Sequence, residues 1–197
     1  MPGQVTAVGT GSLTVEKADG KAGGTVAVKI LLSGNPGIVS MRLFVAYDSS
    51  KLKLLTATDG GLLGTGTVYF GNDLNMNPYT LLWEDALSPV NHTGNGTLAV
   101  LTFKILDTAS LGSTPVTVTL DKHSTFDVNL DDIPFSVTNG SVGIHAEPAV
   151  LFEAVERVLL KKGGAGDDAL IVFEYGSGKS VDIRDLLELR ESLLQGN

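Results

Sequence analysis

The stretch Gly37-Ile-Val-Ser-Met-Arg-Leu-Phe-Val-Ala-Tyr-Asp48 decides the fold class, because its residues alternate in chemical character. Successive side chains of an extended strand point to opposite faces. One face would therefore carry Met41, Leu43, Val45 and Tyr47. The other would carry Ser40, Arg42, Phe44 and Ala46. The first set is apolar and predicts a strand that packs on a core.

The second set is neither fully polar nor fully apolar. A guanidinium beside an exposed phenyl ring is typical of a surface on which another molecule docks. An ordinary solvent-facing sheet, on which Arg42 shields Phe44, would give the same pattern. The strand alone leaves both interpretations open.

Similar short segments recur from Val5 to Ile144 and are separated by turn residues such as Gly34-Asn-Pro-Gly37 and Ala18-Asp-Gly20. The segments that read as strands are residues 12–16, 25–32, 39–47, 52–57, 67–70, 79–83, 96–105, 114–120 and 140–144. No helical period of useful length interrupts them. This pattern predicts an all-β antiparallel sandwich or jelly roll rather than alternating βαβ units.

Composition excludes several classes of function. A formal net charge of -8 and the lack of a basic patch argue against a nucleic-acid partner. The chain has no cysteine, which removes disulfides and thiolate chemistry. We expect no membrane span, because no apolar run is long enough, and Met1-Pro-Gly-Gln4 does not resemble a signal peptide.

Charge density roughly doubles after Pro148, which divides the chain into a β-sandwich at residues 1–146 and an appendage at residues 147–197. Helical spacing from Leu151 to Leu159 predicts a first helix. Residues 169–173 read as a strand, and Asp182 is placed as the N-cap of a second amphipathic helix. The small appendage is therefore α-helical or α+β. Its apolar faces must pack on each other, on the sandwich or on another chain.

The segments 38–54, Leu81-Leu-Trp-Glu-Asp85 and 94–105, with a final Asn139-Gly-Ser-Val-Gly-Ile144, resemble the cohesin family of cellulosome scaffolding proteins over about residues 5–144. The resemblance implies a nine-stranded jelly-roll β-sandwich that is not an enzyme. It implies that one exposed sheet face binds a dockerin, a small helical module that contains calcium, and that the cohesin-like domain needs no cofactor or metal. It also implies an extracellular or cell-surface location in a bacterium.

Carried over by position, the family's docking strands place Ser40 and Arg42 in the first segment and Glu84 and Asp85 in the second. Shared parity along the strands adds Phe44 and Leu82, so these six residues are the expected partner contacts. The best-known cohesin type has Asn and Asp where this chain has Ser40 and Arg42. That exchange reverses a charge and implies a different dockerin specificity.

The segment from Val181 to Arg190 resembles the end of a dockerin calcium loop running into its helix. Placing Asp185 at the twelfth loop position puts Glu174, Gly176 and Gly178 at the first, third and fifth, so two early ligands are missing and we expect little or no calcium binding in the tail. In this interpretation Ile183, Arg184 and Arg190 face a partner. The alternative is an unrelated appendage that caps the sandwich or self-associates.

Catalysis and sugar binding are the remaining alternatives. Glu84 and Asp85 are adjacent in one strand, so they point to opposite faces and cannot readily flank one glycosidic bond. The three histidines lack metal-ligand spacing. A carbohydrate-binding or adhesive cell-surface domain would need an exposed aromatic platform such as Trp83, whose parity opposite Glu84 directs it toward the core. We therefore expect a non-catalytic interaction module, with the carbohydrate-binding domain as the alternative.

Overall fold

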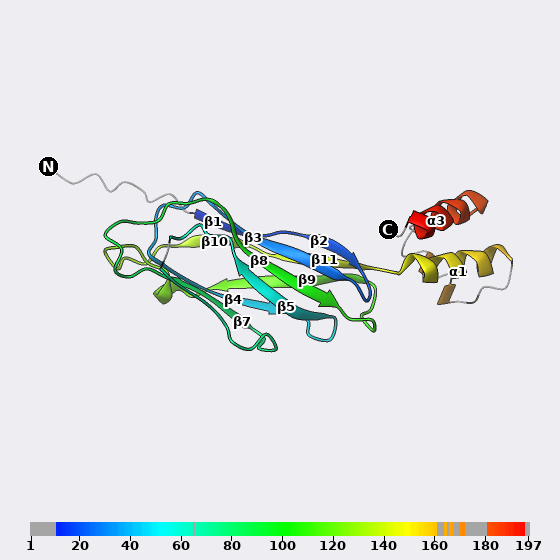
Figure 1. Cartoon of the computed structure of the whole chain (residues 1–197), viewed down its shortest axis with the longest axis horizontal. Helices are drawn as coiled ribbons and strands as arrows, with labels where there is room; N and C mark the ends of the chain where they lie inside the picture. The colour runs from blue at the N-terminus through cyan, green and yellow to red at the C-terminus, as the bar shows by residue number, and fades with distance from the viewer. Residues whose placement is uncertain are drawn as a thin grey trace.

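The structure is a computed structural model that describes residues 11–64, 66–160, 164, 166–167, 170–171 and 181–195. Residues 11–145 form two sheets packed face to face, and two helices lie beyond one end of this sandwich (Figure 1). The prediction of an all-β sandwich followed by a small helical appendage is confirmed. No helix among the described residues is long and apolar enough to cross a membrane.

The first sheet has five strands. In spatial order they are β10 (Phe135–Thr138), β1 (Gly11–Val15), β3 (Thr25–Ser33), β8 (Gly96–Ile105) and β5 (Leu52–Asp59). The second has six, in the order β2 (Ala18–Lys21), β11 (Gly140–His145), β9 (Gly112–Leu120), β4 (Ser40–Tyr47), β7 (Tyr79–Glu84) and β6 (Thr67–Phe70). A short 3-10 helix, η1 (Lys122–Ser124), follows β9. Neighbouring strands are antiparallel except in the pairs β1–β10 and β2–β11.

The core lies between the two sheets. Met41, Leu43 and Val45 of β4 are fully buried, as their alternation predicts. They share the core with Trp83 of β7 and with residues of β3, β5 and β8 from the opposite sheet, including Val28, Ile30, Leu54, Leu101 and Phe103. Tyr47 is half-buried, and its ring meets that of Phe103 edge to face at 5.0 Å between centroids.

The loop before β4 is fixed by a buried asparagine. The amide nitrogen of Asn35 donates to the carbonyl oxygens of His92 and Gly94, and its oxygen accepts from the backbone N–H of Gly37. Gly37 has a φ of +115°, which favours glycine, and a Cβ there would lie 2.7 Å from a side-chain carbon of Asn91. These contacts set the position at which β4 enters the sheet.

The two strands beyond the nine expected are β2 and β10. Both are four-residue edge strands that pair in parallel with a single neighbour. The sequence Ala18-Asp-Gly20 was expected to be a turn, and this was wrong: it pairs with residues 142–144 of β11. Aspartate and glycine are depleted in strands, so here the register with β11 outweighs local propensity.

The appendage contains α1 (Pro148–Leu159) and α3 (Ile183–Gln195), which pack around buried Leu151, Val155 and Ile171. Leu170 and Ile171 are helical, so the expected strand at 169–173 is wrong at these two positions, because Ile171 joins a helix-packed core. Its other three residues, and Glu174, Gly176 and Gly178, lie outside the described residues. The expected N-cap is confirmed, since Asp182 Oδ1 accepts from the Arg184 N–H at 2.7 Å.

Candidate interaction face

The outer surface of the six-stranded sheet holds most of the predicted contact residues. Strands β9, β4, β7 and β6 are neighbours there, so the two segments that contain Arg42 and Glu84 lie in one sheet. Their outward side chains form what we call the interaction face. Its residues are Arg42, Phe44, Thr67, Tyr69, Thr80, Leu82, Glu84 and Thr119.

The centre of the interaction face is apolar. Leu82 lies opposite Arg42 on one side and Tyr69 on the other, so the three form a row across β4, β7 and β6. Phe44 belongs to the next row, between Thr80 and Thr119. Leu82 and Phe44 are half-buried, and Tyr69 is 40% exposed. This cluster resembles the apolar centre of a specific protein interface.

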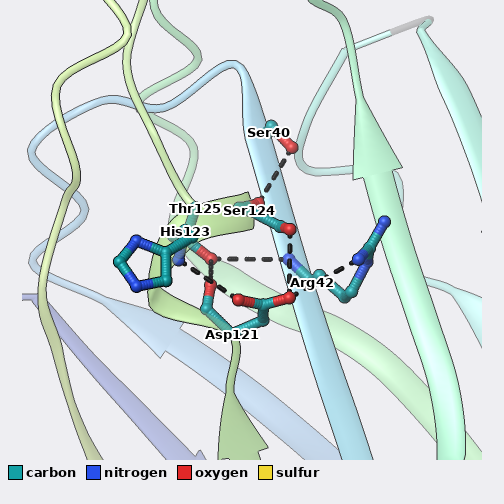
Figure 2. A network of polar contacts seen from close by, with 6 residues as sticks. All are labelled: Ser40, Arg42, Asp121, His123, Ser124 and Thr125. Carbon is teal, nitrogen blue, oxygen red and sulfur yellow. Dashed lines mark hydrogen bonds and ion pairs between the residues drawn. The ribbon is translucent and has the colours of Figure 1, made fainter.

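Arg42 is paired within the chain. Its Nη1 lies 3.5 Å from Asp121 Oδ2, and its carbonyl oxygen accepts from the Asp121 backbone N–H at 3.0 Å. Its own backbone N–H donates to Thr125 Oγ1 at 3.4 Å. Figure 2 shows the contacts of Arg42 with the Asp121 carboxylate and with Thr125, and the ring of His123 directed away from Arg42. The interaction face therefore presents a guanidinium that is paired with Asp121.

The carboxylate of Asp121 is held ionised by its surroundings. Partial burial acts to raise its pKa, but hydrogen bonds from the Ser124 hydroxyl and the His123 backbone N–H, with the charge of Arg42, outweigh it. The pKa consequently lies below its ordinary value. Asp121 thus supplies a permanent negative charge beside Arg42 at neutral pH.

Ser40 is the one expected contact that the structure covers. It is 3% exposed, and its hydroxyl donates to the carbonyl oxygen of Ser124 at 3.0 Å. Its backbone also exchanges hydrogen bonds with Phe126. Ser40 was an expected partner contact, but its side chain is covered, because the end of η1 and the residues after it cross over this part of β4. Ser40 instead holds that segment against β4.

Glu84 and Asp85 differ in their surroundings. Glu84 is exposed at the end of β7, and it makes no ion pair within the described part of the chain. Asp85 Oδ2 lies 2.9 Å from His92 Nε2, and its backbone N–H donates to the Val39 carbonyl. Glu84 is therefore available to a partner, whereas Asp85 mainly fixes the loop after β7.

Exposed apolar loop residues extend the interaction face at the Glu84 end. Leu87, in the loop after β7, is 98% exposed, and Leu130, in the loop after η1, is 72% exposed with a φ of +65°. The two loops are joined, because the Val128 N–H donates to Asn91 Oδ1 at 2.9 Å. Leucine is strained at positive φ, which makes an exposed Leu130 a candidate contact.

Asp121 and Tyr69, which lie beside Arg42 and Leu82, were not predicted from the sequence. Tyr69 meets Leu82 only through the pairing of β6 with β7, and a single strand does not reveal its neighbour. Asp121 carries a usable signal, since Asp-Lys-His-Ser favours a capped turn directly after a strand. The structure confirms that turn, with the His123 N–H donating to Asp121 Oδ1.

The tail residues lie apart from the interaction face. Ile183, Arg184 and Arg190 are all exposed on α3. Asp185, which the dockerin comparison places at a calcium position, instead accepts from the Asp182 backbone N–H at 2.7 Å. Together with the Asp182 cap, this closes the first turn of α3 in the manner of a capping box.

The interaction face is built for noncovalent recognition. It offers an apolar centre, a paired cation and a free carboxylate on a rigid sheet. Within the described residues, no group of three or more His, Cys, Asp or Glu side chains is arranged to hold a metal ion. This fold and this face define a β-sandwich protein-interaction module.

Comparison with known proteins identifies the family. The family model described as the cohesin domain matches residues 11–144, so the chain belongs to the cohesin family, whose members are non-catalytic interaction modules. Cellulose-binding protein A of Clostridium cellulovorans is 31% identical over 165 residues, which are 83% of this chain. The match spans only 9% of the length of that protein.

Solved structures agree with this assignment. The sixth cohesin of Acetivibrio cellulolyticus scaffoldin B, in complex with a mutant Cel5 dockerin, is 26% identical with a TM-score of 0.60, covering 70% of this chain and 100% of that one. A non-cellulosomal cohesin from the archaeon Archaeoglobus fulgidus shares the fold, at 16% identity and a TM-score of 0.58, with 70% of this chain and 93% of that one covered.

Proposed function

We propose that this chain is a non-catalytic assembly module that binds a dockerin-bearing protein through the interaction face. The observation that carries the proposal is the row of Tyr69, Leu82 and Arg42, flanked by Glu84 and Phe44, on a cohesin fold. An apolar centre with charged groups around it is the usual anatomy of a specific interface. Such an interface buries roughly 1,200–2,000 Å² in total.

The complex would assemble enzymes that degrade polysaccharides, at the cell surface or outside the cell. The likeness to a cellulose-binding protein and to a scaffoldin cohesin supports this setting. Calcium would belong to the dockerin, and the cohesin domain would need no cofactor. Of the six expected contacts, four would touch the dockerin: Arg42, Phe44, Leu82 and Glu84. Ser40 and Asp85 would instead hold the neighbouring loops in place.

The carbohydrate-binding alternative has less support. Trp83 is 2% exposed, and its indole N–H donates to Asp59 Oδ1 at 2.8 Å within the sandwich. The residue on which a sugar-stacking surface depended is therefore part of the core.

Isothermal titration against a panel of dockerins, in calcium and then in chelator, tests the proposal. We expect binding to at least one dockerin that is lost when the chelator unfolds the dockerin. Retention on insoluble polysaccharide with no dockerin binding would instead favour the carbohydrate-binding function.

A further inference from the structure

One side of α3 carries an apolar stripe that the described part of the chain leaves uncovered. Ile183, Leu187 and Leu194 are 60%, 48% and 76% exposed. With Arg190 they follow one another at intervals of four, three and four residues, so all four lie on one side of the helix. We call these four residues the α3 stripe. A different side of the same helix already packs on α1, through Leu186 and Leu189.

The α3 stripe aligns three exposed aliphatic side chains on a helix of 13 residues. Single exposed leucines are common, but a contiguous apolar row marks an interaction site. Leu193, 38% exposed, follows Leu186 and Leu189 at helical spacing and belongs to the α1-facing side, so it is not part of the α3 stripe. Helix α3 therefore has a second apolar side that needs a partner.

We propose that the α3 stripe pairs with the α3 stripe of a second copy of this chain, antiparallel, in a two-fold symmetric dimer. A two-fold interface requires a surface that complements itself. In an antiparallel pair Ile183 lies opposite the partner's Leu194, and the partner's Ile183 lies opposite Leu194. Leu187 packs beside the stem of the partner's Arg190, whose guanidinium reaches solvent.

Charges along the stripe select this direction. Arg184 and Glu191 flank the same edge of the α3 stripe, seven residues apart, and neither forms an ion pair among the described residues. An antiparallel pair brings Arg184 near the partner's Glu191, and symmetry repeats the contact. A parallel two-fold pair would place this edge of the two helices on opposite sides of the pair, so Arg184 and Glu191 would find no partner in each other.

The dimer is weak. A fully exposed aliphatic side chain offers on the order of 100 Å² of apolar area, and the exposed fractions of the stripe amount to about two such side chains per copy. The interface therefore belongs to the small, transient class below about 1,200 Å². We expect a dissociation constant on the order of 10–100 μM at low salt.

Sedimentation equilibrium of the full chain, over about 5–500 μM, tests the proposal with two charge reversals. Arg184→Glu alone and Glu191→Arg alone each place like charges in both contacts, so each weakens dimerisation by about tenfold. An equimolar mixture of the two variants recovers the original affinity, because every cross-contact then joins opposite charges. Leu187→Glu abolishes dimerisation, alone or mixed with either.

Several results would overturn the proposal. A chain that stays monomeric at the highest concentration excludes the dimer, and a mixture that fails to recover excludes the antiparallel pairing. Open-ended oligomers that disappear with Leu82→Ala would place the α3 stripe on the interaction face of the next copy. Circular dichroism checks that each variant keeps its helices. If a charge reversal unfolds α3, the unsubstituted chain still tests the proposal. Its dimerisation must weaken as the salt concentration is raised, because salt screens the Arg184–Glu191 contacts.

Discussion

Reversing the charge at position 42 separates binding from stability. Arg42 and Asp121 are 3.5 Å apart and their side chains are 39% and 24% exposed, so their pair is worth about 0.2–1 kcal/mol. Arg42→Asp replaces this attraction by a repulsion of similar size. The free energy of unfolding should therefore fall by roughly 1 kcal/mol, a loss of about 2–4 °C in Tm. The core is unchanged, so unfolding stays cooperative.

The effect on partner binding should be larger. Position 42 lies beside Leu82 at the apolar centre, and the substitution adds a second carboxylate near Asp121 while Glu84 stays unpaired. An uncompensated charge at the centre of an interface typically costs about 2–3 kcal/mol. We expect dockerin affinity to fall by roughly 30- to 150-fold.

Calorimetric titration with thermal unfolding measures both quantities on the same samples. Lys29→Asp is the matched control: it makes the same change of charge at an exposed position of β3, on the outer side of the other sheet. The control should lose less than threefold in affinity. Equal losses for the two variants, or a loss of cooperative unfolding in Arg42→Asp, would refute the reasoning.

Three further substitutions test the interaction face, the hydrophobic core and the loss of stability at acid pH. Leu82→Ala should weaken dockerin binding by about tenfold in calorimetry with little change in Tm, because Leu82 is half-buried. Leu43→Ala should lower the free energy of unfolding in urea by about 2–5 kcal/mol, because its side chain is fully buried, while the folded fraction binds normally. The lowered pKa of Asp121 contributes stability above the ordinary value of 3.8, lost as pH falls through the folded pKa. The stability difference between the chain and Asp121→Asn should therefore shrink from neutral pH to about pH 3 in urea titrations.

Alternation along single strands was enough to predict the sandwich and the inward residues. Met41, Leu43 and Val45 of β4 are buried, and Trp83 points into the core as its parity requires. Strand periodicity is a local property, so one strand suffices to read it. The edge strand β2 was not predicted because Asp and Gly are depleted in strands, so its pairing depends on its distant partner β11. The edge strand β10, Phe135–Thr138, does contain strand-forming residues, and this signal was missed.

The site was harder to predict because exposure depends on residues far away in sequence. Ser40 and Arg42 share one parity, yet Ser40 is buried beneath the segment that contains Ser124 and Phe126. The same segment brings Asp121 to Arg42 and changes the charge that the face presents. The position of a residue along a strand predicts the face of the sheet on which its side chain lies. Whether another segment covers that side chain depends on the tertiary structure.

The interaction face and the α3 stripe lie far enough apart to be occupied at the same time. The tail leaves the sandwich after β11, whose last residues pair with Gly112 at the start of β9, whereas Arg42 meets Asp121 beyond the other end of that strand. The strand between them spans about 30 Å at 3.3 Å per residue. Pairing through α3 therefore leaves the interaction faces of both copies open. A dimer would then offer two equivalent sites, and a partner with two dockerins would bind it more tightly than one with a single dockerin, because the second contact forms within the complex.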